Sequence, residues 1–325
     1  MANRLPGNLI TYGPDVNCTL ALCPVEASIL GYQPSLGASG AFIGLFAVAL
    51  VLHLLEGLRW RASLTGFAIP MVLGCLDEII GYVGRIIMHG NPFSFSGFLM
   101  QIICITTAPV FFCAAIYVTL ARTILFLDRS LARFNPRLLY WVFIPCDVLS
   151  LVFQAAGGAL SSVSTGSNDT GVNMSLFGLS FQVFTLVVFC LLAADFLVRF
   201  HRKQRRERRQ YQQQQQQQQN GDSFSKQTTY GRRVRVFLFF LAAAILFILI
   251  RCVYRIDELS EGYTGTLFRE EGIFYGLESV MITVAVFCLC LGQPGFGLQP
   301  GPESVTASGT ELSSVQDNKY VSSSA

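Results

Sequence analysis

Apolar residues in this chain fall into seven long runs, separated by shorter polar connections. Each run offers roughly the 20 residues that an α-helix needs to cross a bilayer. The predicted helices span about residues 38–56, 66–88, 97–126, 138–162, 173–198, 235–256 and 272–291. The pattern therefore predicts an all-α polytopic membrane protein, a seven-transmembrane-helix bundle over residues 36–294.

Three polar stretches lie outside the predicted helices. Residues 1–35 are interrupted by prolines and are expected to form an extracellular amino-terminal segment. Residues 201–231 combine basic side chains with a glutamine run and are expected to be a disordered cytoplasmic loop. Residues 295–325 are rich in Gly, Pro, Ser and Thr, which predicts a disordered cytoplasmic tail.

The distribution of basic residues predicts the orientation in the membrane. Lysine and arginine gather after the first, third and fifth apolar runs, most densely between Arg199 and Arg235. The alternate connections contain few basic residues, Arg269 being the clear exception. Because such charges stay on the cytoplasmic side, the amino terminus is predicted outside and the carboxyl terminus in the cytoplasm.

Composition supports the membrane class. Hydrophobic residues make up 52% of the chain and charged residues 13%, whereas soluble domains have about 25% charged residues. The net charge of +3 arises in the predicted cytoplasmic connections, so the lipid bilayer rather than a nucleic acid is the expected partner.

The predicted outer face contains candidates for covalent modification. Cys18 and Cys23 are the two cysteines outside apolar runs, and they are a candidate disulfide in an oxidising compartment. Asn17, Asn168 and Asn173 begin glycosylation sequons in stretches that are predicted to lie outside.

Polar side chains inside the apolar runs are the candidate functional residues. At the centre of a membrane helix each charge costs about 2.5–3.5 kcal/mol. Glu78 and Arg85 are seven residues apart and share one helix face, so an ion pair that only fixes packing is one interpretation. The other is a substrate-binding cavity, open towards the outer surface, with a lining of Glu78, Arg85, Gln101, Asp147, Gln154, Gln182, Arg251, Arg255 and Glu278.

Several of these residues belong to short motifs that follow one another along the chain. They are Glu78-x2-Gly81-Tyr82-x2-Arg85, Gln101-x7-Pro109-x7-Tyr117, Asp147-x6-Gln154-x2-Gly157-Gly158, Gln182, Arg251-x2-Tyr254-Arg255-x2-Glu258 and Glu278. From about Tyr32 to Pro294 the chain resembles the RTA1-like family, fungal seven-helix membrane proteins also called the lipid-translocating exporter family. The resemblance implies export or flipping of a long-chain amphiphile such as a sphingoid base, or resistance to toxic amphiphilic compounds.

Other classes fit the sequence less well. A seven-helix receptor that binds an amphiphile or small ligand in an outward vestibule remains the alternative, although the seventh run lacks an Asn-Pro-x-x-Tyr segment. The histidines His53, His89 and His201 are scattered, so neither a metal site nor a catalytic site is predicted. No nucleotide-binding loop is present and no cofactor is expected. The sequence therefore favours a non-enzymatic, plasma-membrane transporter of a long-chain amphiphile.

Overall fold

The structure is a computed structural model that describes residues 4–6, 8–60, 64–127, 132–133, 135–163, 169–215, 224–261 and 269–297. Within these ranges, seven helices are long and apolar enough to cross a membrane, which confirms the predicted class. They are α1 (Leu36–Arg59), α3 (Ile69–Gly90) after the π turn η2 (Leu64–Ala68), α4 (Phe95–Leu127), α5 (Arg137–Val163), α6 (Asp169–Gln215), α7 (Phe224–Ser260), and a composite of α8 (Glu271–Ile273), π turn η5 (Phe274–Val280) and α9 (Met281–Leu291). A short α10 (Pro294–Gly297) follows.

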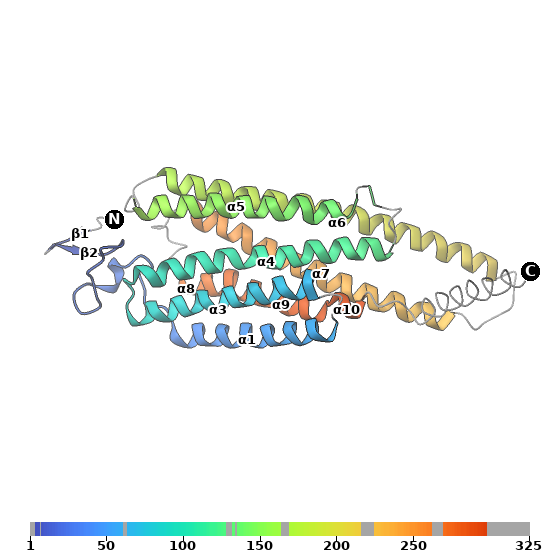
Figure 1. Cartoon of the computed structure of the whole chain (residues 1–325), viewed down its shortest axis with the longest axis horizontal. Coiled ribbons are helices and arrows are strands. Elements are labelled where there is room, and N and C mark those ends of the chain that lie inside the picture. The colour runs from blue at the N-terminus through green and yellow to red at the C-terminus, as the bar shows by residue number, and fades with distance from the viewer. Residues whose placement is uncertain are drawn as a thin grey trace, which may run out of the picture.

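The helices pack as an elongated bundle (Figure 1). The contacts pair α3 with α4 and with α1, α5 with α6, and α7 with α9. Helix α4 lies between the α1–α3 side and the α5–α6 pair (Figure 1). Its most apolar window is 61% buried, the largest share among the seven helices, because the stretch from Phe98 to Ala121 carries no charge and can face neighbours on several sides.

Glycine allows two of these helix pairs to approach closely. A Cβ atom on Gly84 of α3 would lie 2.8 Å from the Gly97 carbonyl oxygen of α4. A Cβ atom on Gly157 of α5 would lie 2.5 Å from the Gly171 carbonyl oxygen of α6. Only glycine fits at such crossings, as in other membrane helix pairs.

The amino-terminal segment covers one end of the bundle. Strands β1 (Arg4–Leu5) and β2 (Leu9–Ile10) form an antiparallel pair with Leu5 opposite Leu9, and a 3-10 turn η1 (Val25–Ala27) follows. A disulfide joins Cys18 and Cys23, and both cysteines pack on Phe93 in the connection between α3 and α4.

The three candidate glycosylation residues are placed differently. Asn17 is exposed, but its side-chain oxygen accepts a hydrogen bond from the Ile10 amide at 2.6 Å. Asn173 is exposed near the beginning of α6. Asn168 lies outside the described residues.

The prediction of a disordered loop at 201–231 was wrong for most of its length. Helix α6 continues to Gln215 and α7 begins at Phe224, so both helices project beyond the bundle (Figure 1). Glutamine, arginine and lysine are good helix formers, and extending an existing helix avoids the cost of nucleation. The rest of the loop, 216–223, and the tail from 298 onward lie outside the described residues.

Candidate functional site

Arg85 on α3 is fully buried and is held by residues from two other segments. Its Nη2 atom lies 3.3 Å from Glu271 Oε1 and 3.2 Å from the Tyr32 hydroxyl oxygen. The guanidinium carbon lies 4.3 Å from the ring centroid of Phe274, in cation–π distance. Burial raises the pKa of Tyr32 against the opposing effect of the Arg85 charge, so this hydroxyl stays neutral.

Glu78 lies on the same buried face of α3 as Arg85, but the two side chains are not partners. Two helical turns separate them by about 10 Å of rise, and Arg85 is directed to Glu271 instead. Both carboxylate oxygens of Glu78 are buried without a hydrogen-bond partner. The charged groups close enough to act on it are Arg251, Glu278 and Asp77. An ion pair between Glu78 and Arg85 is therefore the wrong interpretation.

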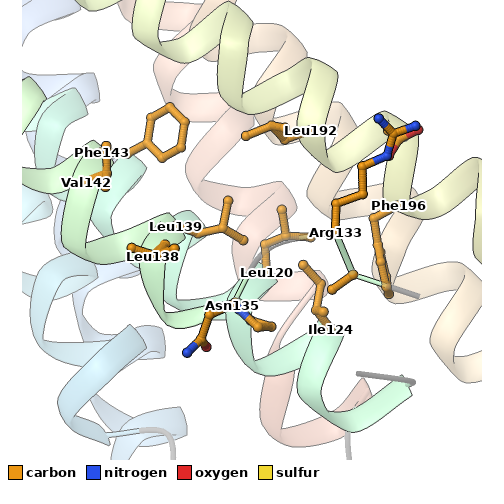
Figure 2. A pocket seen from close by; sticks show the side chains of 13 residues that line it. Leu120, Ile124, Arg133, Asn135, Leu138, Leu139, Val142, Phe143, Leu192 and Phe196 are labelled. Atoms are coloured by element: carbon orange, nitrogen blue, oxygen red, sulfur yellow. The ribbon is translucent and has the colours of Figure 1, made fainter. Parts of the chain in front are cut away.

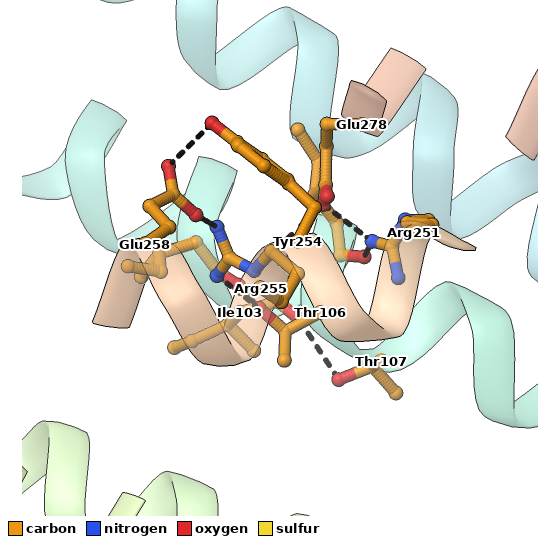
Figure 3. Close-up of polar contacts among 10 residues, drawn as sticks. Ile103, Thr106, Thr107, Arg251, Tyr254, Arg255, Glu258 and Glu278 are labelled. Carbon is orange, nitrogen blue, oxygen red and sulfur yellow. Dashed lines mark hydrogen bonds and ion pairs between the residues drawn. The ribbon is translucent and has the colours of Figure 1, made fainter. Parts of the chain in front are cut away.

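Two further arginines pair with acids where α7 meets the seventh span (Figure 3). Arg251 Nη2 lies 2.6 Å from Glu278 Oε1, and both side chains are almost completely buried. Arg251 also donates a hydrogen bond to the Ile105 carbonyl oxygen of α4. Arg255 pairs with Glu258 one turn further along α7. Glu278 lies in the π turn η5, a local widening of the helix that often marks functional positions.

These polar side chains pack more tightly than the predicted open vestibule requires. The space enclosed by Tyr32, Arg85, Gln101, Arg255 and Glu258 has a volume of about 10 Å³, enough for roughly one water molecule. The space is small because acids and tyrosines from neighbouring segments surround the arginines. The sequence could not show which of these side chains meet. Among the described residues, the side chains of this polar network therefore leave little free space.

The remaining predicted site residues gather along the seam between α5 and α6. Asp147 is 1% exposed; the Tyr117 hydroxyl donates to its Oδ2 at 2.9 Å and the Thr185 hydroxyl to its Oδ1 at 3.2 Å. Further along the seam the Gln154 side-chain amide donates to Gln182 Oε1 at 3.0 Å. The nine predicted residues thus form two groups, with Asp147, Gln154 and Gln182 separate from the arginine network.

An apolar cavity of about 270 Å³ lies between α4, α5 and α6, towards the end of the bundle where α4 finishes (Figure 2). An ion pair between Arg133 Nε and Asp195 Oδ2, at 3.4 Å, stands at its edge, and Arg199 lies 3.1 Å from the same oxygen. The cavity is lined by Leu120, Ile124, Ala132, Arg133, Asn135, Pro136, Leu138, Leu139, Val142, Phe143, Leu192, Asp195 and Phe196.

Aromatic rings separate this cavity from Asp147. Phe143 lines the cavity and lies one helical turn before Asp147 on α5. The Tyr117 ring packs on Phe189 and Phe143, with centroids 4.5 Å and 5.5 Å apart, while its hydroxyl bonds Asp147. A buried carboxylate therefore lies directly behind the aromatic end of an apolar cavity.

Sequence reasoning missed the partners of Arg85 and the whole cavity. Glu271 stood in an acid-rich connection, which could have marked it as a partner for a nearby buried arginine. Tyr32 and Tyr275, whose hydroxyl oxygen accepts a hydrogen bond from Arg85 Nη2 at 3.4 Å, carried no comparable signal. The cavity residues, such as Leu120 and Leu192, are indistinguishable in sequence from ordinary core leucines.

The fold and this network define a seven-helix membrane protein with buried charges, some paired and some not. Residues 71–300 match the sequence profile described as RTA1 like protein. The chain belongs to the RTA1-like family, as its motifs predicted.

Several yeast proteins are similar to this chain. The sphingoid long-chain base transporter RSB1 of Saccharomyces cerevisiae strain Lalvin EC1118 is 30% identical over 291 residues, covering 85% of this chain and 75% of the transporter. The S. cerevisiae protoporphyrin uptake protein 1 is 27% identical, covering 69% of this chain and 67% of its own length. The S. cerevisiae protein RTM1 is 28% identical, covering 71% and 68%. No solved structure matches the chain.

Proposed function

We propose that this protein moves a long-chain amphiphile with a cationic amine headgroup, such as a sphingoid base, across the membrane. One observation carries the proposal. Each buried arginine of the network pairs with an acid: Arg85 with Glu271, Arg251 with Glu278, and Arg255 with Glu258. Glu78 and Asp147 form no ion pair with a basic side chain among the described residues, although Arg251 lies close enough to act on Glu78.

A buried acid without a counter-charge is costly inside a membrane protein, and such residues commonly mark the path of a substrate. An ammonium group supplies the missing charge, and low local polarity strengthens the attraction. A phosphate or carboxylate headgroup would instead meet repulsion at Glu78 and Asp147. The charge pattern thus favours an amine over an anion.

The cavity beside Asp147 suits the apolar part of the same molecule. Its volume of about 270 Å³ lies just below the range of roughly 300–1,000 Å³ for small-molecule pockets, so it holds part of a long chain. Each methylene that leaves water for such a site contributes about 0.8 kcal/mol. In our proposal the amine reaches Asp147 past Tyr117, and part of the alkyl chain occupies the cavity between α4, α5 and α6.

The names of the relatives support transport of an amphiphile but do not identify the molecule that this chain transports. One is named for a sphingoid long-chain base and another for protoporphyrin, so family membership alone does not choose between them. Glu78 and Asp147, which are buried and form no ion pair among the described residues, favour the sphingoid base. Both names describe movement of a molecule, and we propose transport rather than catalysis.

The proposal is tested by reconstituting the purified protein into liposomes with a fluorescently labelled sphingoid base. We expect the native protein to accelerate transfer of the base between leaflets. Asp147→Asn should slow this transfer by about tenfold or more, which corresponds to the loss of about 1.4 kcal/mol of stabilisation. Leu192→Trp should slow it similarly, because the larger ring fills the cavity.

Leu191→Trp is the matched control, since Leu191 neighbours Leu192 but is 65% exposed and lies outside the cavity. It should transfer the base at the native rate. The proposal fails if the Asp147→Asn protein transfers the base as fast as the native protein does. It also fails if liposomes without protein transfer the base as fast as liposomes that contain it. Saturable binding of the base without transfer would favour the receptor alternative.

We further propose that the amino terminus faces outward and that the protein resides in the plasma membrane. The basic connections support the orientation, and the disulfide between Cys18 and Cys23 suits passage through an oxidising compartment. An epitope tag before β1 should be reached by antibody on intact cells. A tag within 216–223 should be reached only after permeabilisation, and the reverse pattern would refute the orientation.

A further inference from the structure

A third cluster of reactive side chains lies at the other end of the seventh span, away from the arginine network. His53 and Glu56 occupy successive turns of α1, and Cys290 projects from the end of α9. The Cys290 sulfur lies 3.2 Å from His53 Nε2, and Glu56 Oε2 lies 3.4 Å from His53 Nδ1. One ligand atom from each residue lies within 4.8 Å of the others.

Hydrogen bonding does not account fully for this cluster. His53 is 0% exposed, yet its Nδ1 and the nearby Glu56 Oε2 both lack a hydrogen bond of acceptable geometry. One turn beyond Cys290, the side-chain amide of Gln293 is also buried with neither atom satisfied. Its oxygen approaches Gly295, which packs on Trp60, the residue that follows α1. Several polar atoms along the α1–α9 seam therefore lack a hydrogen-bond partner.

We propose that His53, Glu56 and Cys290 bind a divalent transition metal such as Zn²⁺. Imidazole, carboxylate and thiolate are all ligands that Zn²⁺ accepts, and tetrahedral coordination places ligand atoms about 3.3–3.6 Å apart. The two short contacts go to different ring nitrogens: Cys290 Sγ lies 3.2 Å from Nε2, and Glu56 Oε2 lies 3.4 Å from Nδ1. With one ring nitrogen as the ligand, the three ligand atoms lie within 4.8 Å of one another, so they move closer together when the metal binds. A ring nitrogen of His53, one Glu56 oxygen and the Cys290 thiolate supply three ligands, and a water or the Gln293 carbonyl oxygen completes the set.

The metal would join α1 to the seventh span. These two helices pack against each other, and a shared ion holds them together more firmly than apolar contact alone. Binding displaces the thiol proton of Cys290, so the affinity rises with pH. In the proposed orientation this end faces the cytoplasm, where a thiol remains reduced.

The test is a titration of the purified, chelator-treated protein in detergent with Co²⁺, which reports a thiolate ligand through a charge-transfer absorption band. We expect one Co²⁺ per chain, displaced by Zn²⁺. Cys290→Ser should abolish the band, and His53→Gln should weaken binding by about tenfold or more. Cys288→Ser, on the same helix two residues earlier, is the matched control and should keep both band and stoichiometry.

A second measurement avoids substitutions, in case the variants fold poorly. Zn²⁺ should slow alkylation of Cys290 in the native protein, followed by mass spectrometry, and leave the rate at Cys288 unchanged. The proposal is overturned if Cys290→Ser retains the charge-transfer band. It is equally overturned if Zn²⁺ fails to protect Cys290 in the native protein.

Discussion

Glu278→Ala is expected to destabilise the protein by about 3–5 kcal/mol, because it leaves the buried Arg251 guanidinium without its acid. Glu278 is 0% exposed and lies 2.6 Å from Arg251. The Ile105 carbonyl oxygen, the other hydrogen-bond partner of Arg251, cannot neutralise the charge. The measurement is thermal unfolding of the purified protein in detergent, where a loss of this size lowers the midpoint by many degrees.

The double variant Glu278→Gln with Arg251→Met separates pairing from general disruption. Removing both charges is often nearly neutral for a buried pair, so we expect most of the lost stability to return. Leu277→Ala is the control, because Leu277 precedes Glu278 but is 36% exposed, and its effect should be small. A double variant as unstable as Glu278→Ala would show that this pair does not account for the destabilisation.

Glu78→Gln is expected to have the opposite profile: stability retained or increased, and transport lost. Both Glu78 oxygens are buried without a hydrogen-bond partner, so removing the charge relieves a desolvation cost instead of breaking a pair. On the proposed function the amine loses an acid on its path. Transfer of the labelled sphingoid base should then fall by about tenfold or more, the equivalent of about 1.4 kcal/mol.

Asp77→Asn is the matched control, since Asp77 is the adjacent acid and is only half-buried. It should retain more transport than Glu78→Gln. Unfolding midpoints and transfer rates of both variants are measured on the same preparations. A Glu78→Gln protein that is markedly less stable, yet transfers the base at the native rate per folded molecule, would make Glu78 a packing residue.

The family assignment and the list of buried polar residues could be predicted from the sequence because both depend on local pattern. Charges at Glu78, Arg251 and Glu278 stand out in apolar runs, and their spacing within a run determines which share a helix face. Their partners could not be predicted. Arg85 could have met Glu78, Asp147 or Glu278 by depth alone, and it meets Glu271, which lies 186 residues away.

The glutamine run shows that composition alone does not predict where a helix ends. A low-complexity polar stretch predicts disorder when it is considered alone, whereas here its first part continues α6 to Gln215. The apolar span before this stretch is already helical, so no new nucleation is needed to extend it. The position at which α6 ends therefore depends on the preceding span as much as on the glutamine run itself.

The sequence by itself determined the seven spans, the RTA1-like motifs and the set of costly buried charges, because hydropathy and helical periodicity act over neighbouring residues. Only the tertiary structure decided which of those charges are paired, and within the part of the chain that the structure describes it left Glu78 and Asp147 without an ion pair. It also created the cavity between α4, α5 and α6 and brought Cys290 to within 3.2 Å of His53, 237 residues away. Ion pairs, cavities and metal ligands require side chains from different helices to meet within a few ångströms, and that geometry depends on how all seven helices pack.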